Sequence, residues 1–279
     1  MPTQAEPHEL QGQFSPQPQT LMVKKLDKGR IADCFRAGAA SYDAAAVVQR
    51  EVGEELVSLL RPTLPEGRAG RVLEIGCCTG VLSELLCRDC RVEQLYLNDL
   101  VDDLCHTAQH RVAGLCRHSE RWSGDIETLQ LPTSLDLVIS SATLQWIEDL
   151  AALFSRIHDA LTDGGLLAVS LFSAGTMHEL KALTGAGLAY RHDDQLQTML
   201  GEGFTLLVQR RREHRLFFPS LQAVLRHIRD TGVGGVARSP LGMGSVKELQ
   251  RRYRERFASE AGLPLTYVST ILLARKKTS

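Results

Sequence analysis

Short apolar runs alternate with stretches of helical spacing along most of the chain. Four runs predict buried strands, at residues 71–76, 92–99, 134–142 and 166–172. Apolar residues at helical spacing lie between these runs and also before the first one, from Lys28 to about Leu60, where prolines end the pattern. Strands that alternate with helices predict an α/β fold, a parallel sheet with helices on both faces.

Beyond Phe172 the alternation continues with longer excursions. We expect a helical stretch at about 177–200, a strand within 204–218, helical segments at 221–230 and 245–260, and a last strand at 265–276. A long late strand followed by a C-terminal strand is typical of an antiparallel pair that closes one edge of a sheet.

The composition is that of an ordinary globular protein, with 43% hydrophobic and 23% charged residues. A net charge of −1 provides no overall field that would recruit nucleic acid or a membrane, and no run approaches the roughly 18 apolar residues of a membrane span. Residues 1–20 lack the apolar core of a secretory signal and are rich in Pro and Gln. We therefore expect a disordered tail over residues 1–27, one domain over residues 28–279, and a cytoplasmic location.

The seven cysteines are an odd number and favour free thiols in a reducing compartment. Cys87 and Cys90 have the spacing of half a zinc site, but no second pair follows at matching spacing. We expect no metal, and half-buried cysteines at a helix end.

The stretch VLEIGCCTGVLSELL at residues 72–86 predicts a strand, a glycine turn and a helix. In a doubly wound sheet such a turn holds the ligand. A dinucleotide site has the pattern G-x-G-x-x-G, but here Cys78 stands at the second glycine position. Glu74 lies two residues before Gly76, and an acid at this place suits a ligand with a positive charge, such as a sulfonium or an ammonium group.

Further acidic residues follow that could bind a nucleoside part of the same ligand. Asp99 ends the second predicted strand, where a carboxylate can accept hydrogen bonds from both ribose hydroxyls. Asp125 is placed to accept from an adenine amino group, with Ile126 packed on the ring. Asp136, at the start of the next strand, is expected to be a turn residue.

Five segments together resemble the motifs of the class I S-adenosylmethionine-dependent methyltransferases over about residues 70–172. They are VLEIGCCTG, LND, GDIETLQLP, LDLVISSATLQWIED and LTDGGLLAVS. A longer resemblance, to the malonyl-(acyl-carrier-protein) O-methyltransferase family, runs almost end to end. It is carried by CFRAGAASYDAAAVVQ, SSATLQWIED, LFSAGTMHELKAL, FPSLQAVLRHIRDTGVGG and GLPLTY.

The resemblance implies a Rossmann-like, mostly parallel, seven-stranded sheet with helical lid insertions at about 176–202 and 220–262. It also implies S-adenosylmethionine as the cofactor. The implied reaction is methylation of the free carboxylate of a malonyl thioester, on an acyl-carrier protein or coenzyme A, early in biotin synthesis.

The family's motifs assign cofactor roles to a set of positions in this chain: Glu74, Gly76, Cys78, Gly80, Asp99, Asp125, Ile126 and Ser141. Its N-terminal YD motif assigns Tyr42 to the active site, touching the cofactor or the substrate. The chain departs from the family at Cys78, where a glycine is usual, and at Ser141, where an asparagine is usual. We expect the first departure to weaken cofactor binding without abolishing it.

On the substrate side we expect Gln145 and Trp146 to shape the acyl pocket, although Trp146 could equally be helix packing. His192 lies in the first insertion. Basic clusters are candidates for docking an acidic carrier, or else are ordinary solvated faces. They comprise Arg210, Arg211, Arg212, Arg251, Arg252 and Arg254, with Lys24, Lys25, Lys28 and Arg30 near the start.

A carboxylate nucleophile is ionised at neutral pH, since its pKa is about 4, so this chemistry requires no general base. Two alternatives remain: a methyltransferase of the same fold acting on another small acid or thioester, and a non-catalytic partner protein that keeps the fold. An NAD-dependent oxidoreductase is disfavoured because the glycine fingerprint is missing.

Overall fold

The computed structural model describes residues 26–233 and 243–278. The strands are β1 (Arg68–Ile75), β2 (Arg91–Asn98), β3 (His118–Arg121), β4 (Leu135–Ser141), β5 (Leu161–Phe172), β6 (Phe204–Phe218) and β7 (Leu263–Lys276). The α-helices are α1 (Lys28–Ala45), α2 (Val47–Leu60), α3 (Val81–Asp89), α4 (Asp102–Arg111), α5 (Leu150–Ala160), α6 (His178–Thr184), α7 (Asp193–Leu200), α8 (Leu221–Asp230) and α9 (Met243–Phe257). Short 3₁₀ turns in the described residues include η1 (Arg61–Thr63), η2 (Pro65–Gly67) and η3 (Leu144–Trp146).

The predicted tail lies outside the described residues, except for its last two positions. Leu26 donates its amide to Glu148 Oε1 (2.7 Å), and Asp27 accepts from the amide of Arg30 (3.0 Å) at the start of α1.

All seven strands form one sheet in the order β3-β2-β1-β4-β5-β7-β6. Strands β1 to β5 pair in parallel, whereas β7 runs antiparallel to both β5 and β6. The predicted mostly parallel sheet with an antiparallel pair at one edge is therefore confirmed. The predicted strands included all of these except the short, polar β3, which has no apolar run.

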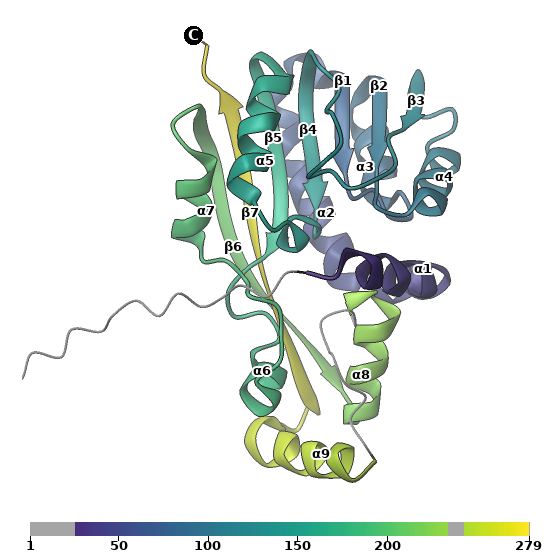
Figure 1. Cartoon of the computed structure of the whole chain (residues 1–279), viewed down its shortest axis with the longest axis vertical. Helices are drawn as coiled ribbons and strands as arrows, with labels where there is room; N and C mark the ends of the chain where they lie inside the picture. The colour runs from purple at the N-terminus through teal and green to yellow at the C-terminus, as the bar shows by residue number, and fades with distance from the viewer. Residues whose placement is uncertain (1–25, 234–242, 279) are drawn as a thin grey trace, which may run out of the picture.

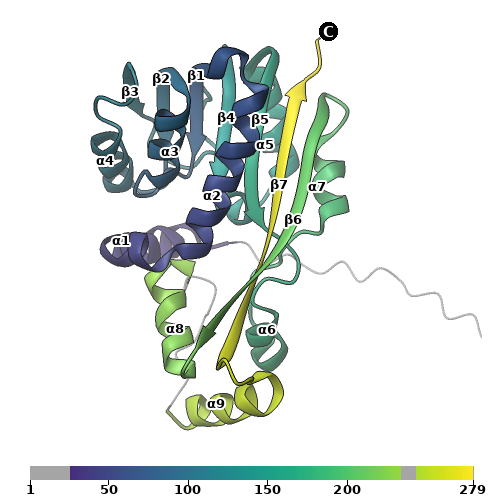
Figure 2. The ribbon, with the colours of Figure 1, turned by 180° about the vertical axis from the view of Figure 1, so that it is seen from behind.

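Helices cover both faces of the sheet, as Figures 1 and 2 show from opposite sides. On β1, Val72 packs into the core beneath α2 and α3, whereas Leu73 and Ile75 pack into the core beneath α5. This alternation follows from the two-residue period of a strand and explains why Val72, Leu73 and Ile75 are all apolar although they face opposite sides of the sheet.

Strands β6 and β7 extend beyond the rest of the sheet (Figure 1). β5 pairs with β7 only over Leu166–Phe172, while β6 and β7 stay paired as far as Phe218 and Leu263. This extension carries α6, α8 and α9, and we call the assembly the lower lobe. Of the first predicted insertion only α6 joins the lower lobe, because α7 packs on α5 instead.

The predicted helix from Lys28 to Leu60 is two helices. The chain leaves helical geometry at Ala46 (φ −82°, ψ 50°), so that α1 and α2 run in different directions. α2 lies along the sheet, whereas α1 crosses the carboxyl ends of the parallel strands and contacts α8. The break therefore places α1 over the part of the fold where ligands bind.

Candidate functional site

The turn after β1 is tied to the end of β2. The amides of Gly76 and Cys77 both donate to the carbonyl oxygen of Asn98, each at 2.8 Å. Cys78 has φ +47°, the left-handed conformation that favours glycine. The glycine usual at this position is thus explained by backbone geometry, and Cys78 adopts the same geometry with a side chain.

Glu74 is completely buried at the end of β1. Ser83 Oγ donates to Glu74 Oε2 at 2.5 Å, while Oε1 has no hydrogen-bond partner among the described residues. Burial raises the pKa of Glu74 to about 8. A buried carboxyl oxygen without a partner is costly in the protein alone and is suited to a ligand that donates to it.

Asp99 follows β2 and faces the same turn. Its Oδ2 accepts from the amide of Cys78 and its Oδ1 from the amide of Val101, both at 2.9 Å. Burial raises its pKa above the ordinary value. The two amides fix the carboxylate and leave its remaining lone pairs for hydroxyl donors.

Two adjoining hollows lie where α1 crosses the strand ends. Both are open to solvent, and the empty volume within them is about 740 Å³ for the main pocket and about 410 Å³ for the side pocket. Residues of the main pocket include Asp99, Asp125, Ile126 and Trp146, and Glu74 lines the side pocket. Four predicted site residues line both hollows: Tyr42, Gly76, Cys78 and Ser141.

Tyr42 therefore stands where the two pockets meet. Its ring lies 6.5 Å from that of Phe35, also on α1, and burial raises its pKa well above the ordinary 10. The phenol is consequently a neutral hydroxyl at neutral pH.

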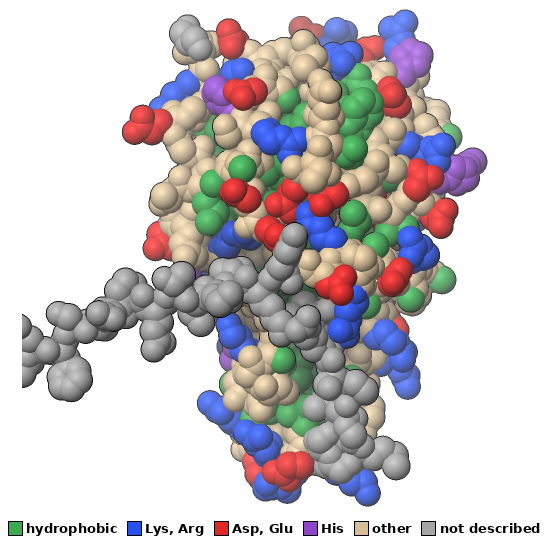
Figure 3. All heavy atoms as spheres, in the orientation of Figure 1, with side chains coloured by type: hydrophobic (Ala, Val, Ile, Leu, Met, Phe, Trp, Pro, Cys, Tyr) green, Lys and Arg blue, Asp and Glu red, His purple; other side chains and the backbone are tan. Residues whose placement is uncertain are grey.

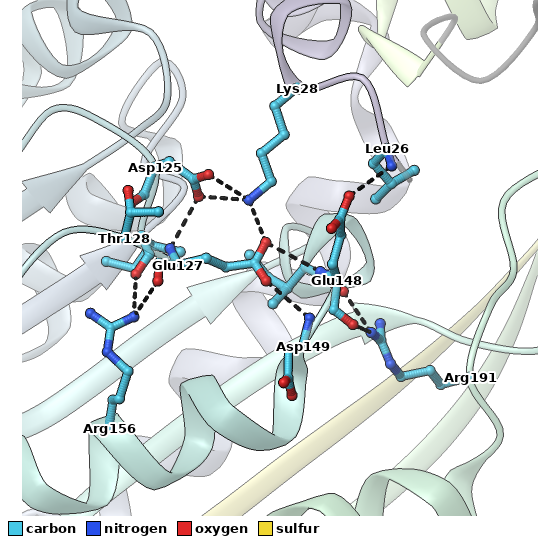
Figure 4. A network of polar contacts seen from close by, with 11 residues as sticks. Leu26, Lys28, Asp125, Glu127, Thr128, Glu148, Asp149, Arg156 and Arg191 are labelled. Atoms are coloured by element: carbon cyan, nitrogen blue, oxygen red, sulfur yellow. Dashed lines mark hydrogen bonds and ion pairs between the residues drawn. The ribbon is translucent and has the colours of Figure 1, made fainter. Parts of the chain in front are cut away.

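Asp125 lies at the far end of the main pocket and is paired with Lys28. Lys28 Nζ contacts Asp125 Oδ1 at 2.7 Å and Oδ2 at 2.6 Å, and it also contacts Glu127 (Figure 4). Ile126 is buried, as a residue packing on a ligand ring should be. Lys28 was predicted to belong to a surface cluster for the carrier, but the structure places it in the pocket wall.

The structure places only one of the two predicted acyl-pocket residues in a pocket. Gln145 is buried and turned away from both pockets, because its Nε2 donates to the carbonyl of Ala142 at 2.6 Å and its Oε1 accepts from the amide of Phe172. Trp146 lines the main pocket, with its ring edge-on to Phe35 at 6.0 Å. Its buried Nε1 has no partner within the described residues.

His192 does not reach either pocket. It is exposed and caps α7, with its amide donating to Gln195 Oε1 at 2.9 Å. The prediction that it contacts the substrate therefore has no support in the fold.

The β6 arginines are held by acids of neighbouring elements. Arg210 and Arg212 pair with Glu55 at 3.3 and 3.1 Å, and Arg211 lies 3.8 Å from Asp193. On α9, Arg251 pairs with its helix neighbours Glu248 and Glu255. No ion pair joins Arg252 or Arg254 to an acidic residue in the described part of the chain, and both are exposed.

The cysteines are free thiols, and Cys87 and Cys90 are buried at the end of α3. Within residues 26–233 and 243–278, no group of three His, Cys, Asp or Glu side chains is arranged to hold a metal ion. Asp136 sits inside β4 rather than in a turn, where its Oδ2 accepts from the amide of Arg71 at 2.7 Å.

Sequence reasoning missed four residues that hold α1 against the site. Glu127 binds Lys28, and Asp43 accepts from Thr79 Oγ1 at 2.6 Å and pairs with Arg111. Only the position of Asp43, next to Tyr42, gave a sequence signal. Partners that are 36 to 99 positions apart cannot be matched from spacing alone.

The donors and acceptors present suit an elongated ligand with a cation at one end. Glu74 offers an unused buried oxygen in the side pocket, Asp99 stands in the middle, and Asp125 accepts at the far end of the main pocket. S-adenosylmethionine has an ammonium group, a ribose and an adenine in this order, so the residues fit the cofactor that the sequence implied.

Comparisons with known proteins agree with this fit. Residues 73–169 match the family described as a methyltransferase domain. The malonyl-[acyl-carrier protein] O-methyltransferase of Chlorobium phaeovibrioides is 38% identical over 254 residues, covering 90% of this chain and 97% of that protein. The corresponding protein of Chlorobium luteolum is 37% identical over 262 residues, covering 92% of this chain and 98% of that protein.

Among solved structures, a putative methyltransferase of Bacillus halodurans superposes with a TM-score of 0.58 at 16% identity. The match covers 80% of this chain and 99% of that chain. At this identity the likeness concerns the fold alone.

Among the helices within residues 26–233 and 243–278, none combines the length and the hydrophobicity that a membrane span requires.

Proposed function

Because the chain belongs to the malonyl-[acyl-carrier protein] O-methyltransferase family, we propose that it methylates the free carboxylate of a malonyl thioester. The proposed substrate is malonyl-acyl-carrier protein or malonyl-coenzyme A, and the proposed role is an early step of biotin synthesis. S-adenosylmethionine is the cofactor.

The main support for the proposal is that Tyr42 lines both pockets, so that the two pockets meet at this residue. In the proposed arrangement Glu74 receives the ammonium end, Asp99 the ribose, and Asp125 the adenine, with Ile126 against the ring. The residues that line both hollows, including Tyr42 and Ser141, then surround the point of reaction.

When bound, the cofactor supplies a methyl group on a positively charged sulfur that a carboxylate can attack in line. The chain contributes alignment and exclusion of water. Ile31, Ala32 and Phe35 form an apolar wall on α1, which keeps water from solvating the carboxylate. Tyr42, neutral at neutral pH, donates a hydrogen bond that orients the substrate.

The proposed reaction requires no general base. No histidine is among the described residues that line either pocket. Burial raises the pKa of the Cys78 thiol far above its ordinary 9, so it stays protonated, and the ammonium of Lys28 is engaged by two carboxylates. An already ionised substrate carboxylate removes the need for a base.

For the carrier, we propose docking on the lower lobe through Arg252 and Arg254 on α9. Acyl-carrier proteins are acidic, and these two arginines are exposed, whereas Arg210 and Arg212 on β6 are already paired with Glu55. Figure 3 shows basic side chains over the lower lobe on the face that it displays. Trp146 is proposed to line the acyl end of the main pocket.

Intact-mass measurement tests the function directly. The protein is incubated with S-adenosylmethionine and, separately, malonyl-carrier, malonyl-coenzyme A and free malonate. One added methyl group on the malonyl thioesters is expected, and methylation of other small acids alone would favour the alternative methyltransferase. Cofactor binding without methyl transfer to any acid would favour the non-catalytic partner protein.

A further inference from the structure

We propose that Lys28 is a positioning residue that holds α1 closed over the main pocket and thereby sets the rate of cofactor exchange. The proposal rests on the proposed function in one respect, namely that an S-adenosyl ligand occupies this pocket.

Helix α1 forms one wall of the main pocket along its whole length. Five of its residues line the pocket, from Lys28 in the first turn to Tyr42 in the last. A ligand bound there contacts α1, and in the proposal its exchange depends on movement of this helix.

The first turn of α1 is held by charged contacts. Lys28 Nζ contacts both oxygens of Asp125 and one oxygen of Glu127, so all three of its N–H groups have an acceptor. The Lys28 and Asp125 side chains are about one quarter exposed and that of Glu127 is 15% exposed, so that solvent screens these contacts only in part.

Glu127 connects this first turn to the rest of the site. Its carboxylate also accepts from the amides of Glu148 and Asp149, at 3.2 and 2.9 Å, just before α5 (Figure 4). Glu148 in turn accepts from the amide of Leu26, and its carbonyl accepts from Arg191 at 3.1 Å. The contacts of Lys28 thus end on a loop that is itself hydrogen-bonded to the segment before α5.

The other end of α1 is fixed in a different way. Asp43 is bound to Thr79, in the turn after β1, and to Arg111 on α4. Immediately after it the chain enters α2, whose Val48, Val52 and Leu56 are fully packed in the core. In the proposed movement α1 swings about Ala46, parts from α8 and frees its first turn.

Lys28 binds the same carboxylate that we assign to the adenine of the cofactor. Lifting the first turn of α1 breaks the contacts of Lys28 and opens the adenine end of the pocket in one movement. The strength of these contacts should therefore appear in the rate at which a bound ligand leaves.

Stopped-flow fluorescence tests the proposal, since one of the two tryptophans of the chain, Trp146, lines the pocket. The variants are Lys28→Met, Lys28→Arg, and Lys277→Met as a matched control at an exposed position after β7. We expect Lys28→Met to raise the dissociation rate of S-adenosylhomocysteine about tenfold, as charge-assisted hydrogen bonds are lost. Lys28→Arg should stay within about threefold of the wild type, and Lys277→Met should be unchanged. A dissociation rate in Lys28→Met within twofold of the wild type overturns the proposal.

The double variant Lys28→Met with Glu127→Gln separates closure from charge. Without Lys28, Asp125 and Glu127 repel each other, and this repulsion alone could weaken binding. If neutralising Glu127 restores the wild-type dissociation rate, repulsion explains the effect and the proposal fails. A rate that stays raised supports it.

Hydrogen exchange of the ligand-free protein gives a test that does not depend on the ligand. In Lys28→Met the amides in the first turns of α1 should exchange about tenfold faster than in the wild type, while those of α2 keep their protection. Unchanged exchange in α1 overturns the proposal. A wild-type protein that binds no S-adenosyl compound contradicts the proposed function, and the exchange experiment still decides the role of Lys28.

Discussion

The amide of Cys78 donates to the carboxylate of Asp99 across 2.9 Å, and it does so from a left-handed backbone conformation. This conformation costs an L-residue about 1–2 kcal/mol. The hydrogen bond therefore persists at a position where glycine would make it with less strain.

Replacing Cys78 by glycine should tighten S-adenosylmethionine binding by a few-fold to about tenfold, or up to about 1.4 kcal/mol. The side chain lines both pockets, so its removal makes room for the ligand while the amide stays in place. Calorimetric titration measures the change, with Cys116→Ser, outside both pockets, as control. Equal or weaker binding by the glycine variant would show that the thiol does not crowd the ligand.

The raised pKa of Glu74 predicts that the stability of the protein and its affinity for the cofactor depend on pH. Its pKa of about 8, raised by burial, lies above the ordinary 4.5, so the folded ligand-free protein binds a proton that the unfolded chain has lost. The contribution of Glu74 to the free energy of unfolding therefore falls as the pH rises from about 4.5 to 8.

A cationic ligand beside Glu74 favours the carboxylate, so the affinity for S-adenosylmethionine should rise over about pH 6 to 8 and level off above it. Glu74→Gln should flatten both profiles, apart from the titration of the ligand itself. Calorimetry of the two proteins across this range checks the prediction. Parallel profiles for the wild type and Glu74→Gln would contradict it.

The chemical step should be independent of pH once the cofactor is bound. Single-turnover rates at saturating cofactor should vary less than about twofold between pH 6 and 8, because the nucleophile is ionised throughout. His192→Ala should behave like the wild type, since His192 only caps α7. A sigmoid near pH 7 that a histidine substitution removes would require a general base.

Tyr42→Phe keeps the ring and removes the hydroxyl at the junction of the pockets. We expect kcat to fall roughly ten- to a hundredfold, while the Kd for S-adenosylmethionine changes less than about threefold, as for a group that orients the reacting carboxylate. Steady-state kinetics and calorimetry separate the two quantities. An unchanged kcat would make Tyr42 a wall residue only.

Carrier docking on α9 predicts a salt-dependent KM. Arg252→Glu with Arg254→Glu should raise the KM for malonyl-carrier about tenfold at 0.1 M salt. The KM for malonyl-coenzyme A should stay within about twofold of the wild-type value. The matched control, Arg91→Glu with Lys277→Glu, changes the net charge equally at the opposite end of the sheet. If both substrates respond alike, or the control has the same effect, the carrier docks elsewhere.

The sequence predicted those parts of the fold that are determined by residues close together along the chain. Strands β1, β2, β4 and β5 each contain a short apolar run. Glu74, Asp99 and the turn after β1 lie at strand ends, which meet at one edge of a parallel sheet. The break at Ala46 was not predictable, because apolar residues continue at helical spacing on both sides of it.

The sequence did not predict which groups the long polar side chains bind. Gln145 was placed in the acyl pocket but binds two backbone groups, and Lys28 was placed on the surface but binds acids about a hundred positions away. For Arg210 and Arg212 the alternatives were carrier docking or an ordinary solvated face, and the sequence did not indicate that α2 brings Glu55 beside them. In each case the partner is chosen by tertiary packing, which residue spacing does not encode.

Strand β7 belongs to two parts of the molecule at once. Its second half pairs with β5 inside the sheet, and its first half pairs only with β6 and supports the lower lobe. A chimera that exchanges the lower lobe between relatives must therefore cut both strands at one register pair, such as Arg212 with Ser269. Joints placed in the loops would instead place a foreign strand beside β5. The carrier-docking surface proposed on α9 can therefore be transplanted only together with half of the two longest strands.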